Sequence, residues 1–272
     1  MCSSDLHYGD GVDITTVADD LIVVHHEGEV TRLEGLSPNA TYEVHGQHVT
    51  TAARPHGALL CRFATVNDVH FGETECGRID DNPQGPIQRA LPGEEPYPEV
   101  MNRGAVAEMA AINPAAVIVK GDLSLDGQQS EWDAFEACYR TAFGERLHVV
   151  RGNHDSYHGQ TTYAGDQWIE LPGASVALLD TCIPTETTGR ITAEQIEWLD
   201  AHLSSSTVPV LVMGHHQQWL ATSDSSHRSP DYFGLHPDSS DALAHLAARR
   251  TAFVAYTAGH THRHREIGRA HV

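Results

Sequence analysis

The chain has 272 residues and a formal net charge of −20, from 37 acidic and 17 basic residues. Nucleic acids and anionic membranes are bound mainly through lysine and arginine, so this balance argues against both as partners. No apolar run approaches the roughly 20 residues that a membrane-spanning helix needs. The length favours one large domain, with or without a small appendage, and a homo-oligomer stays an open alternative.

The two ends of the chain are related to each other at the level of DNA. The tail IGRAHV and the start MCSSDL can be encoded by one piece of DNA read on opposite strands. That DNA resembles a common adapter of short-read sequencing libraries. We therefore expect residues 1–6 and 267–272 to be translated adapter and the gene to be cut at both ends, and such segments are set aside in fold reasoning. The compartment, cytoplasmic or secreted, stays open.

Residues 7–57 alternate short β-type runs with turn residues, in the order DLIVVHH, EVTRLEGL, ATYEVHG and QHVTTAA. This pattern predicts a small antiparallel β unit, and ARPHG at its end predicts a linker. The stretch LEGLSPNATYEV resembles a loop and the following strand of a fibronectin type III domain. Because the unit is too short for that whole domain, we expect a partial one.

Residues 58–266 show a different pattern, in which strands alternate with helices. Helical periodicity covers residues 98–112, 131–143, 192–203 and 241–249. The buried strands are expected in ALLCRFATV, AAVIVK, LHVV, SVALLD, VPVLVMG and TAFVAYTAG. This alternation predicts an α/β layered domain with much parallel pairing. The long connections 72–97 and 217–240 directly follow candidate site residues, so we interpret them as lids, with disordered inserts as the alternative.

Side chains that can bind metals follow five of the expected strands. They are Asp68 and His70 in NDVH, Asp122 in GD, Asn153, His154 and Asp155 in GNHD, His215 and His216 in GHH, and His260 and His262 in GHTH. Ligands of open α/β sheets bind outside the carboxyl ends of the strands, so these side chains are expected to converge.

The chemistry of this set points to metals. Carboxylate, amide and imidazole donors without a thiolate suit divalent or trivalent first-row ions, and iron, manganese and zinc stay open. The donors exceed the needs of one ion and match two ions that share a bridging carboxylate. Any single histidine or GD pair is more often a surface or turn residue, so the prediction rests on the five motifs in order.

The order D-x-H, G-D, G-N-H-D, G-H and G-H-x-H, from Asp68 to His262, resembles the calcineurin-like metallophosphoesterases. The resemblance implies an α/β fold in which a four-layer β-sandwich is flanked by helices and carries a dinuclear metal centre at the strand ends. It further implies a small-molecule phosphate ester as substrate, attacked by hydroxide that bridges the two metals.

The resemblance also implies a role for each residue. One metal is expected on Asp68, His70 and His262, with Asp122 bridging to a second metal that Asn153, His215 and His260 complete. His154 is expected to contact the phosphate and protonate the leaving oxygen, with Asp155 orienting its ring, and His216 to contact the substrate.

Within the superfamily, the sequence is similar to bacterial class III cyclic-nucleotide phosphodiesterases and glycerophosphodiesterases, which implies a phosphodiesterase. Purple acid phosphatases carry tyrosine where Leu125 stands and glycine where His70 stands. The DNA-repair nucleases need clustered basic residues, which this chain lacks. Gln217 and Gln218 replace the prolines usual after the double histidine, so the pocket near His216 stays open. The alternatives are a phosphomonoesterase of acid-phosphatase type and a catalytically silent interaction module.

Overall fold

The computed structural model describes residues 12–26, 29–54, 56–79, 82–219 and 233–262. The chain forms two compact units, each described by itself below. One comprises Leu60–Cys76 and the described part of Arg89–Val272, and the other the described parts of Ser3–Leu59 and Gly77–Gln88. The expected adapter residues 1–6 and 267–272 lie outside the described residues, and the domain boundary at residues 57 and 58 stays a prediction.

The strands of the N-terminal unit pair antiparallel. One sheet has the order β1 (Asp13–Val17), β2 (Leu21–His26), β3 (Glu29–Glu34), and β4 (Thr41–Val44) pairs with β5 (Gln47–Thr50). Alternate side chains of β2, Ile22 and Val24, are buried with Val44 and Val49 in a small core. His45 and Gly46 both have positive φ, as a two-residue hairpin turn requires. The antiparallel β pattern is therefore present, whereas the relation to fibronectin type III stays a prediction.

The larger unit contains two sheets whose strands are mostly parallel. The first has the order β10 (Leu147–Val150), β9 (Val117–Lys120), β6 (Ala64–Val66), all parallel. The second has the order β11 (Gln167–Leu171), β12 (Ala174–Leu178), β13 (Val210–Met213), β14 (Phe253–Thr257), in which β11 is an antiparallel edge strand. The expected parallel pairing is confirmed.

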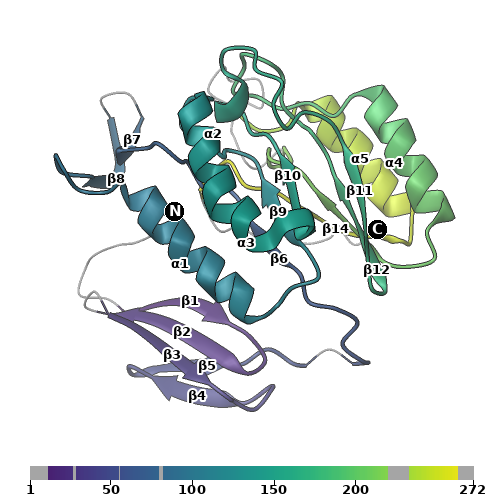
Figure 1. Cartoon of the computed structure of the whole chain (residues 1–272). Helices are drawn as coiled ribbons and strands as arrows, with labels where there is room; N and C mark the ends of the chain where they lie inside the picture. Colours follow the sequence, from purple (N-terminus) through teal and green to yellow (C-terminus); the bar gives the residue numbers. More distant parts are fainter. Residues whose placement is uncertain (1–11, 27–28, 55, 80–81, 220–232, 263–272) are drawn as a thin grey trace. The chain divides into compact units, whose positions relative to one another are not determined.

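Side-chain alternation along the strands builds four layers (Figure 1). Val117 and Val119 of β9 pack against helices, whereas Ile118 between them packs with Val176 and Met213 of the second sheet. On the far side of the first sheet lie α1 (Tyr97–Ala111), α2 (Gln129–Phe135), the π-helical turn η1 (Glu136–Arg140) and α3 (Thr141–Phe143), and on that of the second lie α4 (Ala193–Ser205) and α5 (Pro237–Arg249). The mixed α/β sandwich flanked by helices is confirmed.

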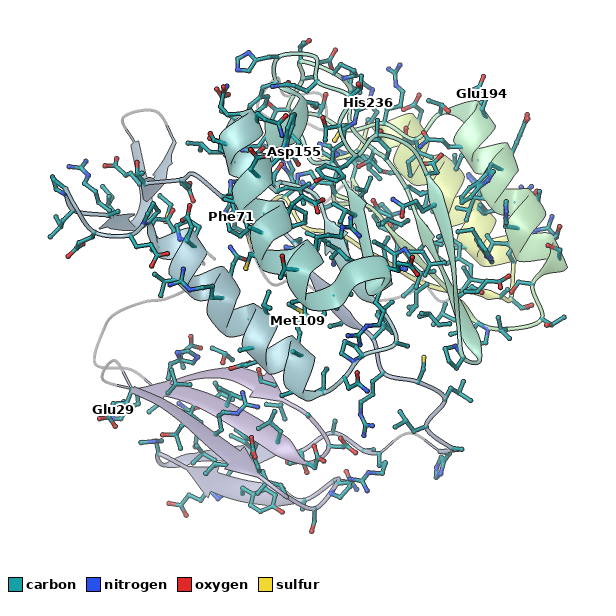
Figure 2. The ribbon with its side chains drawn as sticks, viewed as in Figure 1. Glu29, Phe71, Met109, Asp155, Glu194 and His236 are labelled. Carbon is teal, nitrogen blue, oxygen red and sulfur yellow. The ribbon has the colours of Figure 1, made fainter. Side chains whose placement is uncertain are left out.

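Aromatic packing joins the first motif loop to the helical layer. Phe71, labelled in Figure 2, lies edge-on to Phe135 at 6.0 Å and to Tyr139 at 6.3 Å between ring centroids. Phe71 follows the candidate ligands directly in sequence. The helical layer on this side therefore fixes the loop that carries them.

The observed elements differ from the predicted ones at β6, at β11 and in the connection 72–97. The strand expected across residues 58–66 narrows to β6, because Leu59 and Leu60 are exposed and only residues 64–66 pair with β9. The edge strand β11 was not predicted. The connection 72–97 contains the hairpin β7 (Glu75–Ile79) and β8 (Asn82–Arg89). Residues 220–232 of the other long connection lie outside the described residues, and both lids stay predictions. Among the described helices, none has the length and apolarity to cross a bilayer.

Candidate metal centre

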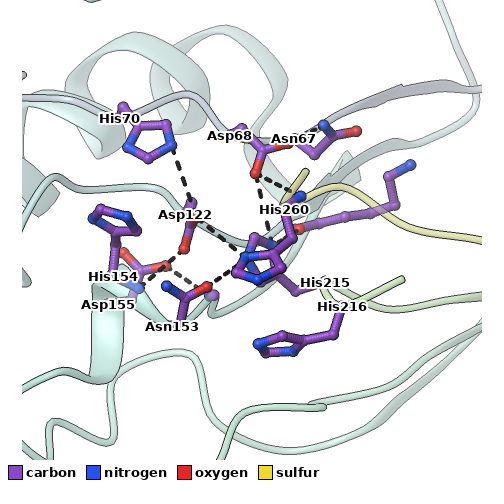
Figure 3. A network of polar contacts seen from close by, with 12 residues as sticks. Asn67, Asp68, His70, Asp122, Asn153, His154, Asp155, His215, His216 and His260 are labelled. Atoms are coloured by element: carbon purple, nitrogen blue, oxygen red, sulfur yellow. Dashed lines mark hydrogen bonds and ion pairs between the residues drawn. The ribbon is translucent and has the colours of Figure 1, made fainter. Parts of the chain in front are cut away.

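The predicted ligands come from both sheets, and those labelled in Figure 3, which are all of them except His262, point toward one another. The first sheet supplies Asp68 and His70 after β6, Asp122 after β9 and Asn153 after β10, and the second supplies His215 after β13 and His260 and His262 after β14. Two groups of ligand atoms form, each within 4.8 Å, namely Asp68, His70, Asp122 and His262, and His215, His216 and His260. The convergence expected from strand ends is therefore present.

Backbone hydrogen bonds hold the first two motif loops together beyond the ends of their strands. The amides of Asp68 and His70 donate to the carbonyls of Gly121 at 3.1 Å and Asp122 at 3.0 Å. The amide of Phe71 donates to the carbonyl of Leu123 at 2.9 Å. The pairing between β6 and β9 thus continues into the loops. It fixes the register of the two loops and therefore the positions of their side chains relative to each other.

The ligand backbones lie in a region of φ that most residues avoid. Ten described non-glycine residues have positive φ, and five of them are predicted ligands, namely Asp68, His70, Asp122, His260 and His262. Such conformations cost on the order of 1–3 kcal/mol each and persist where the surroundings hold them. Aspartate and histidine tolerate this region better than most side chains. Backbone strain is therefore concentrated at the predicted ligands, whose side chains must all face one point.

The first group combines two carboxylates and two imidazoles. The Nε2 atoms of His70 and His262 lie 3.2 Å apart. A carboxylate oxygen of Asp122 lies 3.7 Å from Nε2 of His70, and one of Asp68 lies 3.6 Å from Nε2 of His262. Asp68 and Asp122 are only 6% and 1% exposed. Two buried carboxylates this close require positive charge, so the donor set fits a cation.

Asp122 also reaches the second group. Its Oδ2, the atom that faces His70, lies 3.2 Å from Nε2 of His215. Oδ1 of Asn153 lies 2.9 Å from the same nitrogen, and the rings of His215 and His260 are 5.0 Å apart. This places one carboxylate between both groups, which fits the predicted bridging role, and aims the amide oxygen of Asn153 at the second group.

His216, predicted to contact substrate, lies in the interior. Its side chain is fully buried, and Nδ1 lies 2.8 Å from Oγ1 of Thr181. Its ring packs against those of His215 at 4.9 Å and His260 at 4.8 Å. A buried ring held in this way supports the second group of donors, and the substrate contact stays a prediction without geometric support.

Burial and the carboxylates set the protonation of the imidazoles. Burial lowers the pKa of His70 to about 3 and that of His260 to about 4, so both rings are neutral near pH 7 and can donate a lone pair. Burial also disfavours a charged His215, but the negative charge of Asp122 outweighs it and raises the pKa of His215 to about 9. A metal ion that binds His215 must therefore displace a proton.

His154 stands beside the first group with a defined ring orientation. Its backbone amide donates to Oδ1 of Asp122 at 3.0 Å, and its ring lies 4.7 Å from that of His70. Nδ1 lies 2.6 Å from the carbonyl oxygen of Leu125. Since a carbonyl only accepts, Nδ1 carries the proton, which leaves Nε2 to exchange one with a ligand.

The prediction that Asp155 contacts the ring of His154 is wrong, because the carbonyl oxygen of Leu125 holds that ring instead. The carboxylate of Asp155 accepts hydrogen bonds from the amides of Leu123, Ser124 and Gly152 at 2.8–3.0 Å. It also accepts one from the Ser124 hydroxyl at 2.6 Å, and Nε1 of Trp132 lies 3.4 Å away. Asp155, labelled in Figures 2 and 3, is fully buried. It therefore joins the GD loop to the GNHD loop.

Replacing Asp155 by asparagine is expected to destabilise the fold by about 2–4 kcal/mol, because either amide orientation turns an NH₂ group toward buried donors. The free energy of unfolding from chemical denaturation measures this change. The control is Asp133→Asn on the exposed face of α2, which removes a comparable charge. Asn153 is not used for a control, because it is a proposed ligand. Unchanged stability together with an altered pH dependence of turnover would restore the ring-orienting role.

Several supporting contacts gave no signal in the sequence. The side-chain amide of Asn67 donates to Asp68, and the amide of Asn153 donates to the hydroxyl of Tyr157 at 2.7 Å. The carbonyl of Lys120 lies 2.9 Å from Nδ1 of His215. A Cβ at Gly259 would lie 2.6 Å from Oδ2 of Asp68, so the glycine of GHTH permits the close approach of the two sheets' loops. These contacts orient the donor atoms, and the motif spacing does not reveal them.

Comparison with known proteins assigns the family. A sequence model of calcineurin-like phosphoesterases matches residues 61–264. Because this match covers most of the chain, the protein belongs to that family, which is one of metal-dependent phosphoric ester hydrolases. The family and the clustered donors together indicate a dinuclear metal centre.

Individual relatives are more distant. A probable cyclic nucleotide phosphodiesterase of Synechococcus sp. is 27% identical over 110 residues, which are 38% of this chain and 43% of that protein. The match thus spans less than half of that relative. A dimetal phosphatase structure from Danio rerio aligns over 74% of this chain and 81% of its own, with a TM-score of 0.55 and 15% identity, so the fold is shared. A purple acid phosphatase structure from yellow lupin (Lupinus luteus) aligns over 84% and 45%, with a TM-score of 0.48 and 16% identity.

Proposed function

We propose that the protein hydrolyses phosphodiester bonds of a small molecule of the cyclic-nucleotide or glycerophosphodiester type at a dinuclear metal site. The observation that carries the proposal is the position of Asp122, whose one oxygen faces both His70 at 3.7 Å and His215 at 3.2 Å. Asp68, His70 and His262 would hold one ion, and Asn153, His215 and His260 the other. Two bound cations would activate a water and clamp the phosphoryl oxygens.

His154 supplies the remaining chemistry in this proposal. With Nδ1 held by the carbonyl of Leu125 at 2.6 Å, Nε2 is the atom that can give a proton to a leaving alkoxide. A positioned imidazole in this role contributes about 10²–10⁴-fold to a rate. The side chain is neither fully buried nor exposed, as a group that meets a substrate must be.

A preference for diesters is supported by negative charge near the site. A monoester carries about −1.5 to −2 near pH 7, whereas a diester carries a single negative charge. Glu73, three residues after His70, is half-buried, its amide donates to the carbonyl of His70 at 3.1 Å, and its carboxylate accepts from the hydroxyl of Tyr97. Burial raises the pKa of Glu73, and the hydrogen bond from the Tyr97 hydroxyl opposes that rise. When ionised, a carboxylate three residues from a proposed ligand disfavours the second charge of a monoester.

For the protein loaded with Mn²⁺, we expect kcat/KM for bis(p-nitrophenyl) phosphate to exceed that for p-nitrophenyl phosphate by about 10-fold or more, the size of one extra charge repulsion at a partly screened site. Glu73→Gln should raise kcat/KM for the monoester, leave that for the diester nearly unchanged and so narrow the ratio. Glu108→Gln on the exposed face of α1 is the matched control.

Two outcomes would replace this function by the alternatives named from the sequence. A higher kcat/KM for the monoester would make the protein a phosphomonoesterase. Tightly bound metal without turnover of either ester would make it a silent interaction module.

A further inference from the structure

Asn102 is a polar side chain in the interior of the helical layer. Pro98 and Asn102 are the buried residues of α1, and Asn102 is 6% exposed. A buried amide destabilises a fold unless its hydrogen-bonding groups have partners. An apolar residue would suit this buried position better than an amide. The contacts of the amide therefore indicate why asparagine is present there.

The amide of Asn102 is bonded at both ends. Nδ2 donates to the backbone carbonyl of Val69 at 2.9 Å and to that of Pro98 at 2.8 Å. Oδ1 accepts from the hydroxyl of Tyr139 at 2.7 Å. The two carbonyls only accept, so the end of the amide that faces them is the nitrogen, and the oxygen at the other end accepts from the Tyr139 hydroxyl. The nitrogen is thereby directed at the carbonyl of Val69.

Val69 lies between two proposed ligands of the same metal. Asp68 and His70 on either side of it have φ of 54° and 46°, both left-handed. Their amides are held by carbonyls of the β9 loop, Gly121 and Asp122. The carbonyl of Val69 is held by Asn102 instead. Two left-handed residues, one on each side of Val69, form a strained loop that requires restraint on both sides.

Tyr139 reaches Asn102 from the π-helical turn η1. Its ring is fully buried and stacks on that of Phe135, with centroids 5.1 Å apart and an angle of 23°. A π-helical turn inserts a residue into a helix and re-aims the side chains after it, and such turns are frequent at functional sites. The turn, Tyr139 and Asn102 form a continuous path from the helical layer to the first motif loop.

We infer that Asn102, oriented by Tyr139, is a positioning residue for the first metal: it holds the carbonyl of Val69 and so keeps Asp68 and His70 in the conformation that brings both side chains to one ion. The inference rests on the proposed function, because it concerns the ligands of that dinuclear centre. Among the described residues, the hydrogen bonds and ring contacts of Asn102 and Tyr139 do not include His215, His216 or His260, so the pair acts directly on the first motif loop alone.

The test is a titration of metal-stripped protein with Mn²⁺, followed by isothermal calorimetry and by electron paramagnetic resonance, which separates single from coupled Mn²⁺ ions. Tyr139→Phe keeps the stacked ring and removes the hydroxyl, and should weaken one of two Mn²⁺ ions about 10-fold. Asn102→Ala should weaken the same ion about 100-fold, the upper end of the range for residues that orient metal ligands. Turnover should recover at high Mn²⁺ concentration.

Tyr163→Phe is the matched control. The hydroxyl of Tyr163 donates to Glu136 at 2.6 Å, and its ring meets Phe135 at 6.0 Å in the same aromatic cluster, so it reports a general loss of packing. Circular dichroism of the metal-free proteins verifies folding, and Tyr139→Phe carries the test if Asn102→Ala does not fold.

Three results would overturn the inference alone, and a fourth would also remove its premise. Wild-type affinity for both ions in Tyr139→Phe would contradict it, as would equal weakening of both ions or the same loss in Tyr163→Phe. A wild-type protein that binds fewer than two Mn²⁺ ions would remove the dinuclear centre itself and the inference with it, whereas the first three results leave the proposed function standing.

Discussion

Asp122→Ala is expected to abolish dinuclear metal binding and to lower turnover by more than about 100-fold, beyond the usual cost of changing residues that only orient ligands. The physical reason is that one oxygen of Asp122 faces Nε2 of both His70 and His215, at 3.7 and 3.2 Å. Without this carboxylate, each of the two groups of donors has one anionic ligand fewer. The two groups also no longer share a ligand. The metal content per chain by mass spectrometry of reconstituted protein, alongside turnover of bis(p-nitrophenyl) phosphate, measures both effects.

Asp126→Ala provides the control for Asp122→Ala. Asp126 lies four residues further along the chain and pairs with His158 at 2.9 Å between two exposed side chains. The change removes an equal charge from the same region and should leave two ions bound. Two ions in Asp122→Ala itself would show that the bridging role is wrong.

His154→Ala is expected to retain both metals and lose about 10²–10⁴-fold of turnover, the usual contribution of a positioned general acid. The loss should depend on the leaving group. An alkoxide requires a proton, whereas p-nitrophenolate is stable without one, so a diester with an alkyl leaving group should suffer more than bis(p-nitrophenyl) phosphate. The measured quantities are kcat for both substrates and the metal content.

His158→Ala is the control for His154→Ala, since His158 is exposed and pairs with Asp126 on the surface. Equal losses for both leaving groups would assign His154 to binding of the phosphate rather than to proton transfer. Loss of metal in His154→Ala would contradict the division between ligands and acid.

The sequence pattern predicts the parallel strands and the position of the site for a physical reason, whereas the sandwich was implied by the resemblance to the family. Apart from the edge strand β11, the strands from β9 to β14 are short apolar runs bounded by polar loops, and parallel strands bring their carboxyl ends to one edge of a sheet. The placement of Asp68, Asp122 and His215 near one another follows from that rule and from the local motifs. No contact between distant helices is required to predict it.

The ring-orienting role of Asp155 was implied by the resemblance to the family, and the local backbone explains why the structure departs from it. His154–Ser156 form a 3₁₀ turn, in which successive side chains point about 120° apart. The ring of His154 therefore faces the metal groups while the carboxylate of Asp155 faces the interior. The 3₁₀ turn has no clear sequence signal, so this difference could not be foreseen.

The roles of Asn102 and Tyr139 could not be predicted for a different reason. Asn102 is 33 residues from Val69, and Tyr139 is 37 residues from Asn102. Their contact depends on how α1 packs against η1, which periodicity does not specify. The one available signal was a polar residue on the side of α1 that turns inward.

The division of the proposed ligands between two sheets couples metal supply to the survival of the protein. An ion held by Asp122 and Asn153 from one sheet and by His215 and His260 from the other would bind the docked pair of sheets and neither sheet alone. Its binding free energy would then add to that of the packing between Ile118 and Met213. In a cell short of metal, a larger fraction of chains would open and meet proteases. The amount of enzyme would then follow metal availability even at a constant rate of synthesis.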